Sequence, residues 1–158
     1  MISGLSTFTW VHVALSLVGL ASGLVVVIGL LASRRLDGWT ALFLASTVAT
    51  SATGFGFPFE RFLASHWVGV ISLAVLLAAI LARYVFHLAG AWRWIYAVGA
   101  VVALYFNVFV AIAQAFMKVP ALNAMAPTLS EPPFAIAQAG ALAIFAVLAI
   151  AAAIKFRP

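Results

Sequence analysis

The stretch from Trp10 to Arg35, WVHVALSLVGLASGLVVVIGLLASRR, decides the fold class. It is apolar almost throughout, with only His12 ionisable before the basic pair Arg34–Arg35. An α-helix rises about 1.5 Å per residue, so roughly 20 apolar residues cross the hydrocarbon core of a bilayer. No positive charge precedes the stretch, and it is longer than the core of a signal peptide. We therefore expect a transmembrane helix that is retained, not a cleaved signal.

The rest of the chain has the same character. Of its 158 residues, 67% are hydrophobic and 7% are charged, whereas soluble domains are about 45–50% apolar and about 25% charged. This composition excludes a soluble globular domain and a disordered chain. Backbone groups in hydrocarbon must bond to one another, which favours helices. We predict an all-α, polytopic integral membrane protein with a single transmembrane domain, a five-helix bundle whose spans cover about 10–33, 39–57, 66–86, 95–117 and 134–154.

The second predicted span is the least apolar of the five. It carries Ser46, Thr47, Thr50, Ser51 and Thr53. A re-entrant helix is the alternative for this segment, but five full spans agree better with the charge distribution. Hydroxyl groups in membrane helices usually bond their own backbone or a neighbouring helix, so we prefer packing to pore lining as their role.

The net charge of +5, from eight basic and three acidic residues, indicates orientation. Cytoplasmic connections of membrane proteins are enriched in Lys and Arg, which places Arg34–Arg35 in the cytoplasm, the N-terminus outside and the C-terminus in the cytoplasm. This topology puts six basic residues on the inner side: Arg34, Arg35, Arg83, Arg93, Lys155 and Arg157. The expected partner is therefore the lipid bilayer and not a nucleic acid. The absence of cysteine excludes disulfides and Cys-ligated metals.

The segment 118–133 is the longest predicted connection and lies on the outer side. It contains Pro120, Pro127, Pro132 and Pro133. Proline removes a backbone donor and interrupts helices, so a long helix is not expected here. Two interpretations remain open, an ordered cap over the outer face and a plain surface loop.

Three short motifs resemble those of small, uncharacterised multi-pass membrane proteins of bacteria. They are Trp92-Arg93-Trp94, KVPAL at 118–122 and SEPPF at 130–134. The resemblance runs the full length of the chain and implies a bacterial inner membrane. It brings no activity, cofactor or catalytic residue with it.

Polar residues inside membrane spans are costly and are therefore candidates for function. In the fourth span a small and polar face repeats every three or four residues, which places its members on one side of a helix. Its members are Tyr96, Ala100, Ala103, Asn107, Ala111, Gln114 and Lys118. We expect this face to point into the bundle, either for helix packing or to line a site.

The strongest polar side chains gather at the outer ends of the predicted spans. We predict that they line an outward-facing pocket sealed below by an apolar inner half. The predicted lining is His12, His66, Asn107, Gln114 and Gln138, with Glu60, Arg61, Lys118 and Glu131 at the mouth.

Two histidines in this set, His12 and His66, are candidate ligands for b-type haem or a divalent metal. Glu60 or Glu131 would complete a metal site. The chain contains no H-x-x-x-H or H-E-x-x-H pattern, and histidines without a ligand at a membrane surface are the alternative. We also note Gly19-x-x-x-Gly23, a motif of closely packed helices, for which we expect packing within the chain, with the Ala-rich last span as a candidate partner.

Three functions fit this sequence. The first is binding of a small molecule, lipid, quinone, metal or haem in the outer pocket. The second is a role as a structural or accessory subunit of a homo-oligomer or larger membrane complex. The third is a small channel or transporter with Asn107 at its narrow point. No catalytic residue is predicted, because the single aspartate, Asp37, lies on the inner side, away from His12 and His66.

Overall fold

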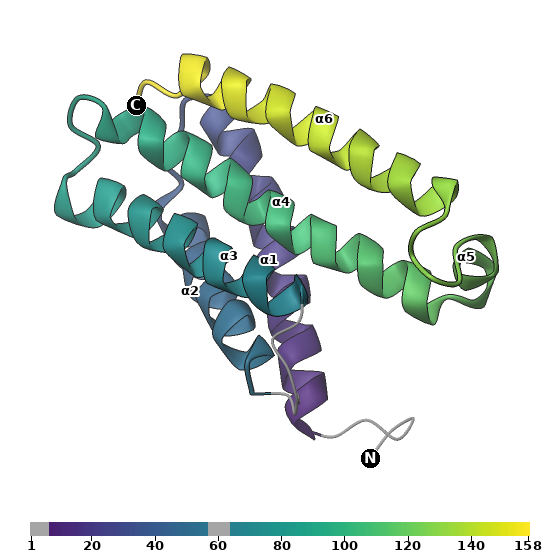
Figure 1. Ribbon diagram of the computed structural model, residues 1–158. Helices are drawn as coiled ribbons and strands as arrows, with labels where there is room; N and C mark the ends of the chain where they lie inside the picture. Colours follow the sequence, from purple (N-terminus) through teal and green to yellow (C-terminus); the bar gives the residue numbers. More distant parts are fainter. Residues whose placement is uncertain (1–6, 57–63) are drawn as a thin grey trace.

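A computed structural model describes residues 7–56 and 64–158, and the described chain is helical with no β-strand in it. The helices, in chain order, are α1 (Thr7–Leu31), α2 (Asp37–Gly54), α3 (Ala64–Ile80), the π-helix η1 (Leu81–Val85), α4 (Trp92–Lys118), α5 (Pro120–Met125) and α6 (Pro132–Lys155) (Figure 1). The π-helix continues α3 directly, so the two form one rod.

Four helical segments in the described part of the chain are long and apolar enough to cross a membrane: Thr7–Leu31, His66–Val85, Trp92–Lys118 and Pro132–Lys155. They correspond to the first, third, fourth and fifth predicted spans, and they indicate a multi-pass membrane protein. The second predicted span also forms a helix, α2, of 18 residues. Because α2 is more polar than the others, it is not among these four.

The helix α4 is the centre of the bundle. It packs against α1, α3 and α6, while α1 forms its most extensive contact with α2 (Figure 1). The helix α6 lies on the outside of α4 and is exposed over most of its length, including Ile136 at 70% and Ile150 at 63% exposure. Exposed aliphatic side chains of this kind are expected to face lipid.

Close packing occurs where α1 crosses α2 and α4, at Gly19 and Gly23. A Cβ atom on Gly23 would lie 2.6 Å from a methyl carbon of Leu104 and 2.8 Å from the ring of Phe43. The motif Gly19-x-x-x-Gly23 therefore serves packing within the chain, as predicted. The close neighbours of both glycines belong to α2 and α4, so the Ala-rich α6 is not the partner at these positions.

The segment 118–133 contains a short helix, α5, which begins with Pro120 at its first turn. Proline suits that position because its missing N–H group would have no helical partner there. The helix α5 packs against α4 at the tip of the α4–α6 hairpin (Figure 1). The expected interruption of helical structure by proline is therefore confirmed.

We predict that Gly23→Leu destabilises the bundle by about 1–3 kcal/mol, because the added side chain must displace Leu104 and Phe43. The matched control is Gly140→Leu on α6, where a Cβ atom has no neighbour within 4 Å. Thermal unfolding of the purified protein in detergent measures both. Equal midpoints for the two variants would contradict the assigned crossing point.

Candidate functional site

The two histidines predicted at the outer end both contact the last turn of α2. His12 Nδ1 lies 2.8 Å from Thr53 Oγ1. The His66 side chain is buried, and its ring centroid lies 5.5 Å from that of Phe55. The end of α2 therefore joins the start of α1 to the start of α3.

Two of the predicted amides link neighbouring helices. Asn107 Nδ2 donates to Thr47 Oγ1 at 3.2 Å, which ties α4 to α2 beside Gly19. Gln138 Nε2 donates to the carbonyl oxygen of Phe109 at 3.1 Å, which ties α6 to α4. The other polar atom of this amide, Gln138 Oε1, is buried and accepts no hydrogen bond from the described residues.

The polar face of α4 points into the bundle over only part of its length. Tyr96, Ala100 and Ala103 are fully buried, Asn107 is half-buried, and Gln114 and Lys118 are exposed. This face therefore leaves the bundle core toward the end of α4 that carries α5. The predicted inward orientation holds for its first half.

Glu131, predicted at the pocket mouth, is bonded within its own connection. Its carboxylate accepts hydrogen bonds from Thr128 Oγ1 at 2.7 Å and from the Ser130 backbone N–H at 3.1 Å. The hydrogen bond from the Thr128 side chain lowers the pKa of the Glu131 carboxyl below its usual value. This carboxylate stabilises the turn before α6. The other two predicted mouth residues, Glu60 and Arg61, lie outside the described residues.

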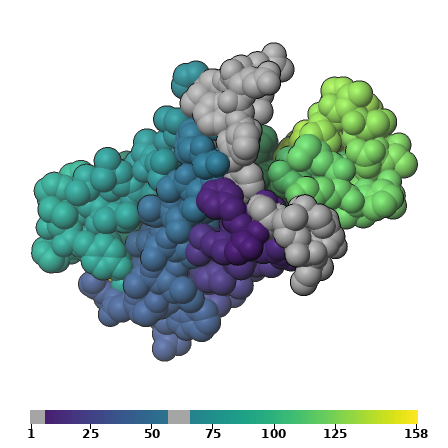
Figure 2. All heavy atoms as spheres, turned by 90° about the horizontal axis from the view of Figure 1, so that it is seen from below, coloured from purple at the N-terminus to yellow at the C-terminus, as the bar shows by residue number. Residues whose placement is uncertain are grey.

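The start of α1 and the end of α4 lie far apart. Figure 1 shows that α1 and α4 cross and then run in different directions. In Figure 2 the end of α4 with α5 forms a green lobe set apart from the purple start of α1. The predicted lining residues are thus divided between two walls formed by different helices: α1 and α3 carry His12 and His66, whereas α4 and α6 carry Gln114 and Gln138.

A metal site with three or more His, Asp or Glu ligands is not found among residues 7–56 and 64–158. Glu60, which would complete a site with His12 and His66, is outside those ranges. Ligation of a haem or metal by the two histidines therefore stays a prediction.

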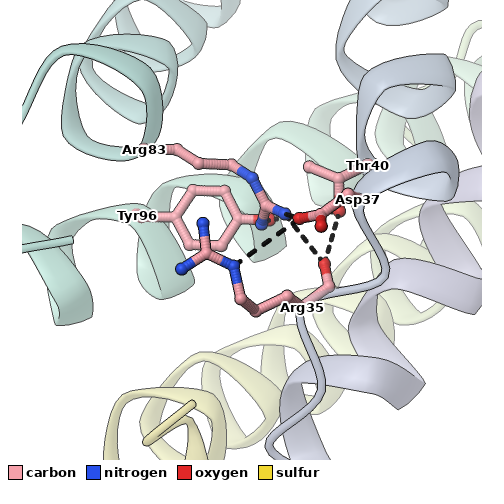
Figure 3. Close-up of polar contacts among 5 residues, drawn as sticks. All are labelled: Arg35, Asp37, Thr40, Arg83 and Tyr96. Carbon is pink, nitrogen blue, oxygen red and sulfur yellow. Dashed lines mark hydrogen bonds and ion pairs between the residues drawn. The ribbon is translucent and has the colours of Figure 1, made fainter. Parts of the chain in front are cut away.

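The opposite end of the bundle holds a polar cluster that the sequence analysis did not find (Figure 3). Its centre is Arg83, which is 2% exposed. Arg83 Nη1 donates to Tyr96 OH at 2.9 Å, and Nη2 donates to the carbonyl oxygen of Arg35 at 3.0 Å. The same guanidinium forms an ion pair with Asp37. One side chain of η1 thereby holds the α1–α2 connection and the start of α4.

Further hydrogen bonds extend this cluster across α2. Tyr96 OH donates to Thr40 Oγ1 at 3.5 Å, and Thr40 Oγ1 donates to the carbonyl oxygen of Arg35 at 3.1 Å. The guanidinium carbon of Arg83 also lies 5.1 Å from the centre of the Tyr96 ring, a cation–π distance. This end of the bundle is therefore closed by polar groups that bond one another across α2, η1 and α4.

The sequence carried a signal for this cluster. Asp37 is the only acidic residue on the predicted inner side, so a partner among the basic residues there was to be expected. A π-helix, which is often found at functional positions, supplies that partner.

No protein-family model, curated protein or solved structure matches the chain.

We predict that Arg83→Met lowers the free energy of unfolding by about 3 kcal/mol, because it leaves buried polar partners without a donor. Asp37→Asn should cost less than Arg83→Met, because the Asp37 side chain is 78% exposed and asparagine keeps a side-chain oxygen that can accept a hydrogen bond from Arg83. Denaturation in detergent measures both variants. Similar small losses for the two would show that Arg83 does not hold this end together.

Proposed function

We propose that the chain binds a small molecule in the outer half of the bundle, between the wall of His12 and His66 and the wall of Gln114 and Gln138. The observation that carries this proposal is Gln138 Oε1, which is buried and accepts no hydrogen bond from the described residues. A buried carbonyl oxygen without a donor costs about 1–3 kcal/mol. A bound molecule with an N–H or O–H group would remove that cost.

The polarity of the two walls suggests the chemistry of the ligand. Gln114 presents an exposed amide within an otherwise apolar helix, and Gln138 offers an acceptor. The surrounding spans are apolar, so a ligand that combines an apolar body with a hydrogen-bond donor fits best. A reduced quinone, a lipid headgroup and a small amphipathic solute belong to this class. In an alternative form of the same proposal, the bound molecule is a haem or metal held by His12 and His66.

The proposal includes five membrane crossings, with the N-terminus outside and the C-terminus in the cytoplasm of a bacterium. The path of α2 supports the fifth crossing. Its first residue, Asp37, pairs with Arg83 at one end of the bundle, and Thr53 contacts His12 at the other. Three of its hydroxyls donate to carbonyl oxygens of its own backbone: Ser46 to Phe43 at 3.1 Å, Thr50 to Ser46 at 2.8 Å and Thr53 to Ala49 at 2.7 Å. This bonding reduces the polarity that α2 presents to its surroundings and argues against a hydroxyl-lined channel.

A role as an accessory subunit is the second candidate, and the exposed aliphatic face of α6 favours it. Three side chains on that face are each at least 60% exposed: Ile144, Val147 and Ile154. Such a face suits another membrane protein as well as lipid. Purification of the chain together with stoichiometric partners would favour this function over ligand binding.

We predict that the protein extracted in mild detergent carries a bound molecule of defined mass, and that Gln138→Met loses it. Methionine keeps the length of the side chain and removes both polar atoms of the amide. Ile136→Met, two residues away on α6 and exposed at 70%, is the matched control. Native mass spectrometry gives the mass, and an absorption spectrum with elemental analysis identifies a haem or metal. An adduct that persists in Gln138→Met would refute the proposed site.

We predict that an epitope tag added after Pro158 is not labelled on intact cells and becomes labelled after the membrane is permeabilised. The physical reason is the concentration of basic residues at that end of the bundle. A tag before residue 1 is the reciprocal control and should be labelled without permeabilisation. Labelling of the Pro158 tag on intact cells would mean that the proposed topology is reversed or that one of the five crossings is absent.

A further inference from the structure

The basic residues at the inner end of the bundle fall into two groups. Arg83 and Arg93 are used inside the protein. Arg93 Nη1 donates to the carbonyl oxygens of Ala153 at 2.9 Å and Phe156 at 2.5 Å, which caps the end of α6. Helix ends present carbonyl groups without helical partners, and a cation there satisfies them. These two arginines therefore hold helices together.

The other four basic residues, Arg34, Arg35, Lys155 and Arg157, are exposed. The nearby carboxylate, Asp37, is paired with Arg83 and lies 3.6 Å from Arg35. The backbone N–H of Arg157 donates to Ser33 Oγ at 2.8 Å, which brings the end of the chain against the connection between α1 and α2. One region with a net positive charge thus contains Arg34, Lys155 and Arg157.

An apolar groove on α6 leads to this region. It has a volume of about 410 Å³ and is lined by Val147, Ile150, Ala151, Ile154 and Lys155. The small side chain of Ala151 leaves the depression between its larger neighbours. From Val147 to Lys155 the helix rises about 12 Å, which is close to the depth of one hydrocarbon leaflet of about 15 Å.

We propose that this surface binds an anionic phospholipid, with an acyl chain in the α6 groove and the phosphate at Lys155 and Arg157. The geometry matches an amphipathic molecule, because an apolar groove of leaflet depth ends at Lys155, two residues from Arg157, and the nearby Asp37 carboxylate is already paired with Arg83. Lipid phosphates attract basic side chains at the membrane surface. This site lies at the opposite end from the proposed small-molecule pocket and does not depend on it.

The test measures lipid preference by native mass spectrometry. The purified full-length protein is mixed with equal amounts of palmitoyl-oleoyl phosphatidylglycerol and the corresponding phosphatidylcholine. The wild type should retain the phosphatidylglycerol in excess, and Lys155→Gln should lower this preference about fivefold, the effect of removing one cation near a lipid surface. Lys155→Arg, which keeps the positive charge at the same position, is the matched control and should keep the preference.

A second variant tests the groove independently of charge. Ala151→Phe fills the depression and keeps every cation, so it should reduce the retained phosphatidylglycerol. An excess of inorganic phosphate should not displace the lipid, because phosphate alone lacks the acyl chain. The proposal is overturned if the wild type shows no preference, if Lys155→Arg lowers it as much as Lys155→Gln, or if free phosphate competes fully. Circular dichroism in phosphatidylcholine alone verifies that each variant is folded.

Discussion

The close approach of α1 to α2 and α4 at Gly19 and Gly23 sets the geometry of the bundle. Because neither residue has a side chain, Phe43 and Leu104 pack directly against the α1 backbone, and Asn107 bonds Thr47 beside it. Helices that touch at one crossing point and leave it at an angle must separate farther along. The divergence of α1 and α4 away from the crossing follows from that contact.

The polar side chains at the two ends of the bundle are bonded differently. At the end that carries η1, Arg83 bonds a tyrosine hydroxyl, a backbone carbonyl and a carboxylate, so its donors serve three structural elements at once. At the opposite end, Gln114 on α4 is exposed, and Gln138 on α6 has an amide oxygen that accepts no hydrogen bond from the described residues. A buried charge is tolerated when it is fully bonded, which makes the Arg83 cluster suited to holding helices together.

Apolar composition was sufficient to predict the helices, because hydropathy adds along the chain and needs no knowledge of neighbours. The bounds of α1, α4 and α6 lie within three residues of the predicted spans. The bonds of Arg83 and Gln138 could not be predicted in this way, since they depend on which helices are adjacent and how far each is shifted along its axis. Arg83 was read from the sequence only as an orientation charge. The burial of Arg83 follows from the packing of η1 against α4. A count of charges along the chain carries no information about that packing.

The π-helix that ends α3 also fixes the spacing between α3 and α4. Its wide turn, closed by the Phe86 N–H to the carbonyl oxygen of Leu81 at 2.9 Å, holds one residue more than an α-helical turn. One buried stripe of this rod contains Leu76, Ala79 and Arg83. The extra residue of the π-helical turn is accommodated after them in the chain. Loss of one residue here would rotate the chain that follows by about 100° relative to α3. Tyr96 would then be carried away from Arg83, so the length of this turn is a mechanical constraint on the chain, separate from the chemistry of its side chains.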